Sequence, residues 1–204
     1  MKNNFFISIL FCFLLSVQNL YADNFQFYVK DISIENEGNI IFANNGKAIS
    51  KNKNLEIVAK KYKYTKSLDQ LESNDGVIFI KNENIKIKFN QIKLNNKNNI
   101  ITASNGIEIK DLKKSLNIQG ENIIFDRGKN TIKASNGIEI KDLKKSLNIQ
   151  GENIIFDRGK NTIKASNGIE IKDLKKSLNI QGENIIFDRG KNTIKASNGI
   201  EIKD

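Results

Sequence analysis

The sequence predicts an all-β fold, an elongated twisted β jelly roll or β solenoid that is built from repeats of about 30–31 residues and open at both ends. Asn-Gly or Asp-Gly recurs at a nearly constant spacing, and apolar residues alternate with polar ones between these pairs. Beyond the N-terminal segment, no stretch has a helical apolar period. A single unit of this kind cannot bury its apolar face, whereas stacked units form a continuous interior.

The repeat runs through the whole chain after residue 22. The glycines that mark it are separated by 30, 30, 31, 31 and 31 residues. They are Gly46, Gly76, Gly106, Gly137, Gly168 and Gly199. We therefore treat residues 23–204 as one repeat domain, with diverged units over 23–105, identical 31-residue units from 106, and a truncated last unit.

The stretch Asn105–Ser135 recurs letter for letter at Asn136–Ser166 and again at Asn167–Ser197. Packing constrains only the inward positions, so identity at the outward positions indicates a recent tandem duplication, an assembly artefact or a deliberate design. Because the chain stops at Asp204 inside a fourth unit, we expect the natural chain to continue.

Each unit is expected to contribute about three short strands that share one apolar face. Apolar and polar residues alternate in GIEIK (106–110), SLNIQ (115–119) and NTIKAS (130–135). The apolar phase slips by one residue between Ile118 and Ile123, which predicts a bulge at Gly120–Asn122.

Turns are expected at the Asn-Gly and Asp-Gly pairs, at DRGKN (126–130) and at NNKNN (95–99). These residues accept left-handed backbone or close a turn with their side chains. Lys60-Lys61 and Asn90-Gln91 fall at the position of the predicted bulge in the earlier units.

Residues 1–22 are predicted to be a secretory signal peptide. A basic start with Lys2 precedes an apolar stretch over Phe5–Val17, and Ala22 supplies the small residue at the cleavage point. The alternative is an uncleaved anchor, for which the apolar stretch is short. Cys12, the single cysteine, lies in this segment, so the mature chain has no disulfide and no thiol chemistry. We expect the mature protein in the periplasm, either free or associated with the outer membrane.

Without the signal peptide the net charge falls from +10 to +9, because Lys2 is lost. This charge favours anionic partners such as phosphorylated lipid or an anionic membrane surface, although a lysine-rich solvated surface explains it equally simply. Export argues against nucleic acid as a partner.

The absence of histidine excludes Ser-His-Asp and Cys-His catalysis and the usual zinc sites, so we expect no enzyme activity, cofactor or metal. The recurring carboxylates Glu108, Asp111, Glu121 and Asp126 are interpreted as surface charges. An alternative is a β-helical carbohydrate enzyme that uses Asp126 and Glu121.

The apolar columns allow two interpretations. If the interior is closed and filled, the protein is a stable rod. If the two sheets splay along one side, the same columns line a groove for alkyl chains. Cationic side chains at its rim would then meet anionic head groups; these are Lys110, Lys113, Lys114, Arg127 and Lys129. In either case the open ends offer edge strands to another protein.

The stretch Ser115–Gly137, SLNIQGENIIFDRGKNTIKASNG, resembles the repeat of the OstA-like lipopolysaccharide-transport family, to which the LptA bridge proteins and the periplasmic domains of the LptD assembly proteins belong. An apolar strand precedes a small and an acidic residue, an apolar pair ending in an aromatic, a polar turn and an apolar-x-Ala-x-x-Gly segment. Here these features are Ile118, Gly120-Glu121, Ile124-Phe125, residues 126–130, and Ile132, Ala134 and Gly137. Phe27–Gly46 and Leu55–Tyr64 fit the same pattern.

The resemblance implies a twisted β jelly roll that is open along one side and holds the acyl chains of lipopolysaccharide. It also implies that such domains join end to end with partner jelly rolls of a transport bridge, or with further copies of themselves, by pairing their edge strands. The groove candidates are Phe27, Ile34, Ile57, Ile87, Ile107, Ile109, Leu116, Ile118, Phe125 and Ile132. The main rival is a secreted structural or adhesive β solenoid with a closed core.

Overall fold

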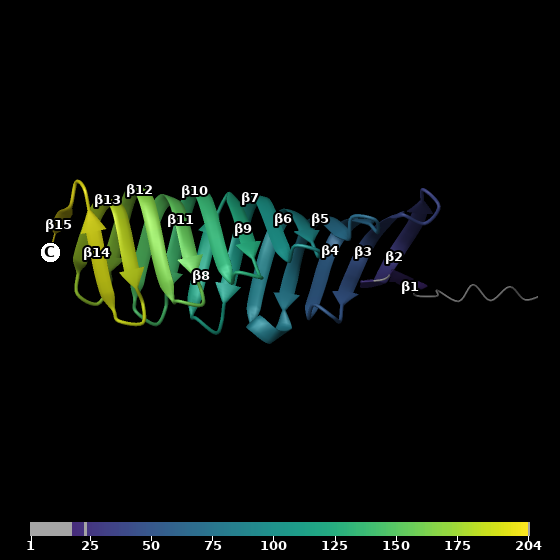
Figure 1. Cartoon of the computed structure of the whole chain (residues 1–204), viewed down its shortest axis with the longest axis horizontal. Coiled ribbons are helices and arrows are strands. Elements are labelled where there is room, and N and C mark those ends of the chain that lie inside the picture. Colours follow the sequence, from purple (N-terminus) through teal and green to yellow (C-terminus); the bar gives the residue numbers. More distant parts are fainter. Residues whose placement is uncertain (1–17, 23, 204) are drawn as a thin grey trace, which may run out of the picture.

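The computed structural model describes residues 18–22 and 24–203. Their strands form one antiparallel sheet in which neighbours in the sequence are neighbours in space, so that the chain climbs steadily along a rod (Figure 1). The strands are β1 (Gln18–Ala22), β2 (Phe25–Glu35), β3 (Ile40–Ser50), β4 (Leu55–Thr65), β5 (Gln70–Ile80), β6 (Ile85–Asn95), β7 (Ile100–Asp111), β8 (Leu116–Gly120), β9 (Asn122–Asp126), β10 (Thr131–Asp142), β11 (Leu147–Asp157), β12 (Thr162–Asp173), β13 (Leu178–Asp188), β14 (Thr193–Ser197) and β15 (Glu201–Lys203), with a 3-10 turn η1 (Lys81–Glu83). The predicted all-β fold is therefore confirmed. No helix in these ranges is long and apolar enough to cross a membrane.

Most strands are long and bend in the middle, which corrects the expectation of turns at the Asn-Gly pairs. In β10 the segments NTIKAS and GIEIK are two halves of one strand, and Asn136 and Gly137 join them with φ of 66° and 57°. The residues do adopt left-handed backbone, as turn residues would. They bend the strand instead of reversing it, because both halves stay paired with the same neighbour, β11.

The extra residue of the 31-residue units is a β-bulge at this bend. Between β10 and β11, Ser135 pairs with Asn153 and Ile138 pairs with Gly151, so Asn136 and Gly137 together oppose one residue. In the 30-residue units the register continues with one residue on each side of the bend. The bulge predicted at Gly120–Asn122 lies instead on the facing strand, where Asn136 and Gly137 of β10 supply the extra residue. At Gly120–Asn122 itself the strand is only interrupted, between β8 and β9.

The bends fold the sheet so that its two halves face each other. The turns that connect the strands accordingly lie on two long edges. One edge, which we call the arginine rim, carries the turns at 36–39, 66–69, 96–99, 127–130, 158–161 and 189–192. The other, which we call the lysine rim, carries the turns at 51–54, 81–84, 112–115, 143–146 and 174–177. The turns expected at 126–130 and 95–99 are thus confirmed within a residue.

The interior between the two halves is filled by their inward side chains. Near the N-terminal end, the rings of Phe25 and Tyr64 approach edge-on at 5.3 Å, and those of Phe27 and Tyr62 at 6.0 Å. Phe25 and Phe27 lie on the half next to the lysine rim, whereas the tyrosines lie on the half next to the arginine rim. A single cluster of buried apolar side chains then continues to Phe187 in β13.

Gly76, like Gly46, is required by close approach of the strands at a bend. A Cβ on Gly76 would lie 2.5 Å from the carbonyl oxygen of Val58 and 2.6 Å from Cβ of Ala59. Gly137 occupies the matching place in a later unit, where the bulge gives more room and nothing lies within 4 Å. The bend therefore needs glycine for different reasons in the two kinds of unit.

The predicted signal peptide overlaps the first strand. Residues 1–17 lie outside the described residues, whereas Gln18–Ala22 form β1 and pair with the first half of β2. Cleavage after Ala22, which stays a prediction, would remove β1 and leave β2 as the first strand of the sheet.

Candidate functional site: the apolar interior and its polar seam

Nine of the ten groove candidates line the interior. All nine are buried to within a few per cent of their surface; they are Phe27, Ile57, Ile87, Ile107, Ile109, Leu116, Ile118, Phe125 and Ile132. Ile34 is the exception, because half of its surface is exposed. β1 covers only Phe25–Val29 of β2, so the second half of that strand has no outer neighbour.

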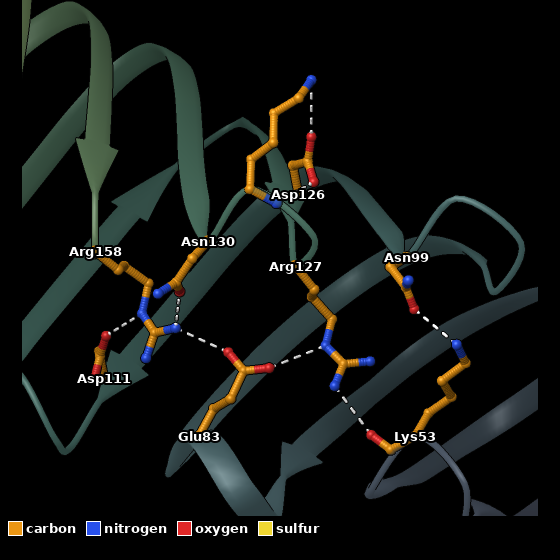
Figure 2. A network of polar contacts seen from close by, with 9 residues as sticks. Lys53, Glu83, Asn99, Asp111, Asp126, Arg127, Asn130 and Arg158 are labelled. Carbon is orange, nitrogen blue, oxygen red and sulfur yellow. Dashed lines mark hydrogen bonds and ion pairs between the residues drawn. The ribbon is translucent and has the colours of Figure 1, made fainter. Parts of the chain in front are cut away.

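The two rims meet along the side of the rod opposite the bends, where polar side chains join them. We call this contact the seam. Near the N-terminal end Asn24 donates to Asp69 at 2.8 Å, and further along Lys53 donates to Asn99 at 2.9 Å. Arginines of the arginine rim then reach across to the lysine rim (Figure 2). The structure is thus closed at the seam, in contrast to the open side that the family resemblance implies.

Arg158 makes the central contact of the seam. Its Nε donates to Oδ2 of Asp111 at 2.7 Å, and its Nη1 donates to Oε2 of Glu83 at 2.8 Å and to Asn130. The guanidinium also lies 5.6 Å from the ring centre of Phe125, at the boundary between the polar seam and the apolar interior. Only 4% of the Arg158 side chain and none of the Asp111 side chain is exposed.

One unit further along, Arg189 repeats this arrangement with Asp142. Its Nε donates to Oδ2 of Asp142 at 2.6 Å, and its Nη2 donates to the carbonyl oxygen of Lys114 at 2.8 Å. One unit earlier, Arg127 has no aspartate at the matching position, which is occupied by Ile80. Arg127 donates instead to Glu83 at 3.2 Å and to the carbonyl oxygen of Lys53 at 3.0 Å.

These contacts correct the expected role of three cations. Arg127 was expected at the rim of a groove, but its guanidinium is committed to the seam. Lys129 forms an ion pair with Asp126 at 3.3 Å within its own turn. Lys110 pairs with Glu108 at 3.1 Å on the outward face. Lys113 and Lys114 lie on the lysine rim, and their contact with anionic head groups stays a prediction.

The interior reaches the surface near the last strands. A cavity of about 300 Å³ opens there, which we call the mouth. Its floor is apolar and consists of Leu147, Ile171, Leu178, Ile180, Phe187 and Ile194. Its edge is cationic, because Lys144, Lys145, Lys175 and Lys176 of the lysine rim line it beside Asp173 and Asn192. Apolar chains with an anionic head match this combination of surfaces.

Asp126 and Glu121, the carboxylates that the enzyme alternative would use, lie at the start of a turn and at a break between two strands. Asp126 Oδ1 accepts the backbone N–H of Lys129 at 2.9 Å, and this hydrogen bond holds the pKa of Asp126 below its usual value. Glu121 is exposed at the break between β8 and β9. Within residues 18–22 and 24–203, no group of three acidic, histidine or cysteine residues could hold a metal ion.

Sequence reasoning missed the seam, although one signal pointed to it. The alternation that places Ile107 and Ile109 inward also places Asp111 inward, and a buried carboxylate requires a partner. The partner, Arg158, is 47 residues away, and only the pairing of the rims brings the two together.

The chain is a bent antiparallel β-meander whose apolar interior is closed by a polar seam and opens at a cationic mouth. The comparison with solved structures concerns the meander fold. The crystal structure of LptH, the LptA-homologous periplasmic component of the lipopolysaccharide transport device of Pseudomonas aeruginosa, has this fold. It matches with a TM-score of 0.55 and 12% identity over 60% of this chain and 96% of that chain. The fold inferred from the family resemblance is thereby confirmed. No protein-family model and no curated protein sequence matches the chain.

Proposed function

We propose that the protein is a periplasmic lipopolysaccharide carrier, without catalytic activity, that holds acyl chains against its apolar interior. One observation carries this proposal: the interior is apolar along its length, from Phe25 in β2 to Phe187 in β13. Within residues 24–203 this interior is accessible at the mouth, which four lysines edge. The phosphates of lipopolysaccharide would lie on the lysines while its acyl chains contact the apolar floor. LptH, a component of such a transport device, shares the fold.

The closed interior requires an account of how lipid would gain access. The core side chains already pack against one another, so acyl chains must displace them or separate the two halves of the sheet. Separation would break the contacts of the seam, which are polar and join side chains from different strands. The backbone ladders within each half would remain intact. The seam is therefore the side of the rod at which opening disrupts the fewest backbone hydrogen bonds.

The proposal includes partners that join end to end. If β1 is removed with the signal peptide, β2 offers a free edge at one end of the sheet, and β14 and β15 lie at the other. Another jelly roll of a transport bridge, or a second copy of this chain, could add its edge strand at either place.

The rival function is that of a structural rod. The filled interior and the closed seam favour it, because a rod needs no space for a ligand. The two functions differ in whether the mouth binds lipid.

A fluorescent fatty acid that lipopolysaccharide displaces tests the proposal. Ile180→Gln places an amide on the floor of the mouth, and Ile186→Gln makes the same change on the outward face of the same strand, β13. We expect Ile180→Gln to weaken probe binding about tenfold, because an apolar contact is lost, and Ile186→Gln to leave it unchanged. No displaceable binding by the wild-type protein would favour the rod.

A further inference from the structure

The lysine rim carries a row of exposed leucines that do not pack into the interior. Leu112, Leu143 and Leu174 begin three successive turns and are 68%, 62% and 69% exposed. On the arginine rim the first turn residues of the same units, Arg158 and Arg189, point inward and are buried. The first turn residue is thus an exposed leucine on the lysine rim and a buried arginine on the arginine rim. Because the units are identical in sequence, this contrast recurs in each unit.

Each leucine is followed by two lysines whose charge is not compensated. Among the described residues, the lysine pairs 113–114, 144–145 and 175–176 form no ion pair within 4 Å. Asp111 and Asp142, which precede the first two pairs, are neutralised by the seam arginines. Asp173, which precedes the third pair, has no seam arginine among the described residues, and its Oδ1 accepts the backbone N–H groups of Lys175 and Lys176 at 3.0 and 3.1 Å. Glu108, Glu139 and Glu170 pair with Lys110, Lys141 and Lys172. The seam thus leaves the lysine rim positive.

Hydrogen bonds join the three turns into a row. The N–H of Leu143 donates to the carbonyl oxygen of Ser115 at 3.0 Å, and the N–H of Leu174 donates to that of Ser146 at 3.0 Å. Successive turns are therefore hydrogen-bonded neighbours two strands apart, at a spacing of roughly 10 Å. Three leucines and six lysines project along one edge of the rod.

We propose that this row docks the rod on the surface of a bilayer that contains anionic lipid. Lysines near such a surface are attracted to the phosphates, and the leucines can insert at the boundary between head groups and acyl chains. A protein partner fits less well, because the leucines are spaced too far apart to form a continuous patch and lysine is depleted from protein interfaces. The row shares Lys144, Lys145, Lys175 and Lys176 with the edge of the mouth, whereas its leucines do not line the mouth.

A single tryptophan tests the docking, since the sequence contains none. Leu143→Trp places the reporter on the row, and Lys160→Trp places it at an exposed position of the arginine rim. With vesicles of phosphatidylglycerol and phosphatidylethanolamine, we expect a blue shift of the emission only for Leu143→Trp, reversed by salt. With phosphatidylcholine vesicles we expect none. A shift for neither variant, or an equal shift for both, would overturn the proposal.

Charge-matched variants separate docking from a general effect of net charge. The triple variant Lys113→Gln, Lys144→Gln, Lys175→Gln removes three charges from the lysine rim. The control Lys129→Gln, Lys160→Gln, Lys191→Gln removes three from the arginine rim of the same units. We expect the first variant to lower the affinity for the anionic vesicles, measured by sedimentation, about a hundredfold. Each lysine contributes about 1 kcal/mol near such a surface, and roughly 1.4 kcal/mol corresponds to a tenfold change in affinity. Equal weakening by the control would contradict a specific row. Lys144 and Lys175 also edge the mouth. The fatty-acid probe with Ile180→Gln reports the floor of the mouth, whereas Leu143→Trp reports the row, so the two proposals can fail separately.

Discussion

The buried ion pairs of the seam have an energetic consequence at the scale of single residues. Asp142 is the carboxylate partner of Arg189 among the described residues, whereas Arg158 has both Asp111 and Glu83. Replacing a buried pair by apolar residues is often neutral, but removing one partner leaves an uncompensated charge. The two units therefore respond differently to the same substitution, although their sequences are identical.

We predict that Asp142→Ala lowers the free energy of unfolding by about 3–5 kcal/mol, and that Asp111→Ala lowers it less, because Glu83 still pairs with Arg158. Urea unfolding followed by circular dichroism measures both. The double variant Asp142→Leu, Arg189→Met should recover most of the loss. If the double variant is no more stable than Asp142→Ala, the seam does not act through its buried charge.

Tyr62 gives the protein a predictable response to alkaline pH. Its hydroxyl lies 2.7 Å from the carbonyl oxygen of Gly46 and 2.9 Å from that of Ile57, and burial raises the pKa of Tyr62 well above its usual value of 10.0. The unfolded chain therefore loses this proton at lower pH than the folded protein does. The stabilisation by the neutral phenol is complete below pH 10 and is lost as pH rises above that value.

We predict that Tyr62→Phe lowers the free energy of unfolding at neutral pH by about 1 kcal/mol, because the single O–H that the two carbonyl oxygens share is lost. Above about pH 10 its stability should fall less steeply than that of the wild type. Urea unfolding across this pH range makes the comparison, with Tyr28→Phe, on the outward face of β2, as a control that keeps the steeper fall. An identical alkaline fall for Tyr62→Phe would exclude Tyr62 as its source.

At the scale of the strand, the period-2 alternation predicted every inward candidate except Ile34, whereas the reversals expected at the Asn-Gly pairs were wrong. Asn-Gly has the same left-handed backbone in a hairpin turn and in a bulge, so local sequence cannot distinguish the two. In β7 and β10 the chain continues past Asn-Gly against the same neighbouring strand. Only the pairing of whole strands reveals this. The DLKKS turn, which was not among the predicted turns, contains no glycine and is closed by Ser115 in left-handed backbone.

We predict that the protein tolerates alanine less well at Gly76 than at Gly137. In Gly76→Ala the new Cβ would meet the backbone of β4, which cannot move without breaking its ladder, so we expect a loss of about 2 kcal/mol or more of unfolding free energy. Gly137→Ala meets nothing within 4 Å and carries only the strain of its positive φ, about 1 kcal/mol. Thermal and urea unfolding of both variants would show the order, and the reverse order would contradict the close approach at Gly76.

At the scale of the whole molecule, identical units build a rod whose two rims differ. The repeat predicted the elongated fold and nine of the ten inward residues, because both follow from local alternation and stacking. It could not predict the seam or the mouth. These depend on which turns face each other, and that arrangement joins residues such as Asp142 and Arg189 across 47 positions of sequence.

The central claim is that the interior carries acyl chains, and photo-crosslinking to lipopolysaccharide in cells tests it most directly. A photoreactive residue at Ile87 lies in the interior of β6, and one at the neighbouring Lys88 lies on its outward face. We predict a lipopolysaccharide adduct at Ile87 and none at Lys88. A folded, periplasmic protein that gives no adduct at Ile87 would contradict the claim and identify the protein as a closed rod.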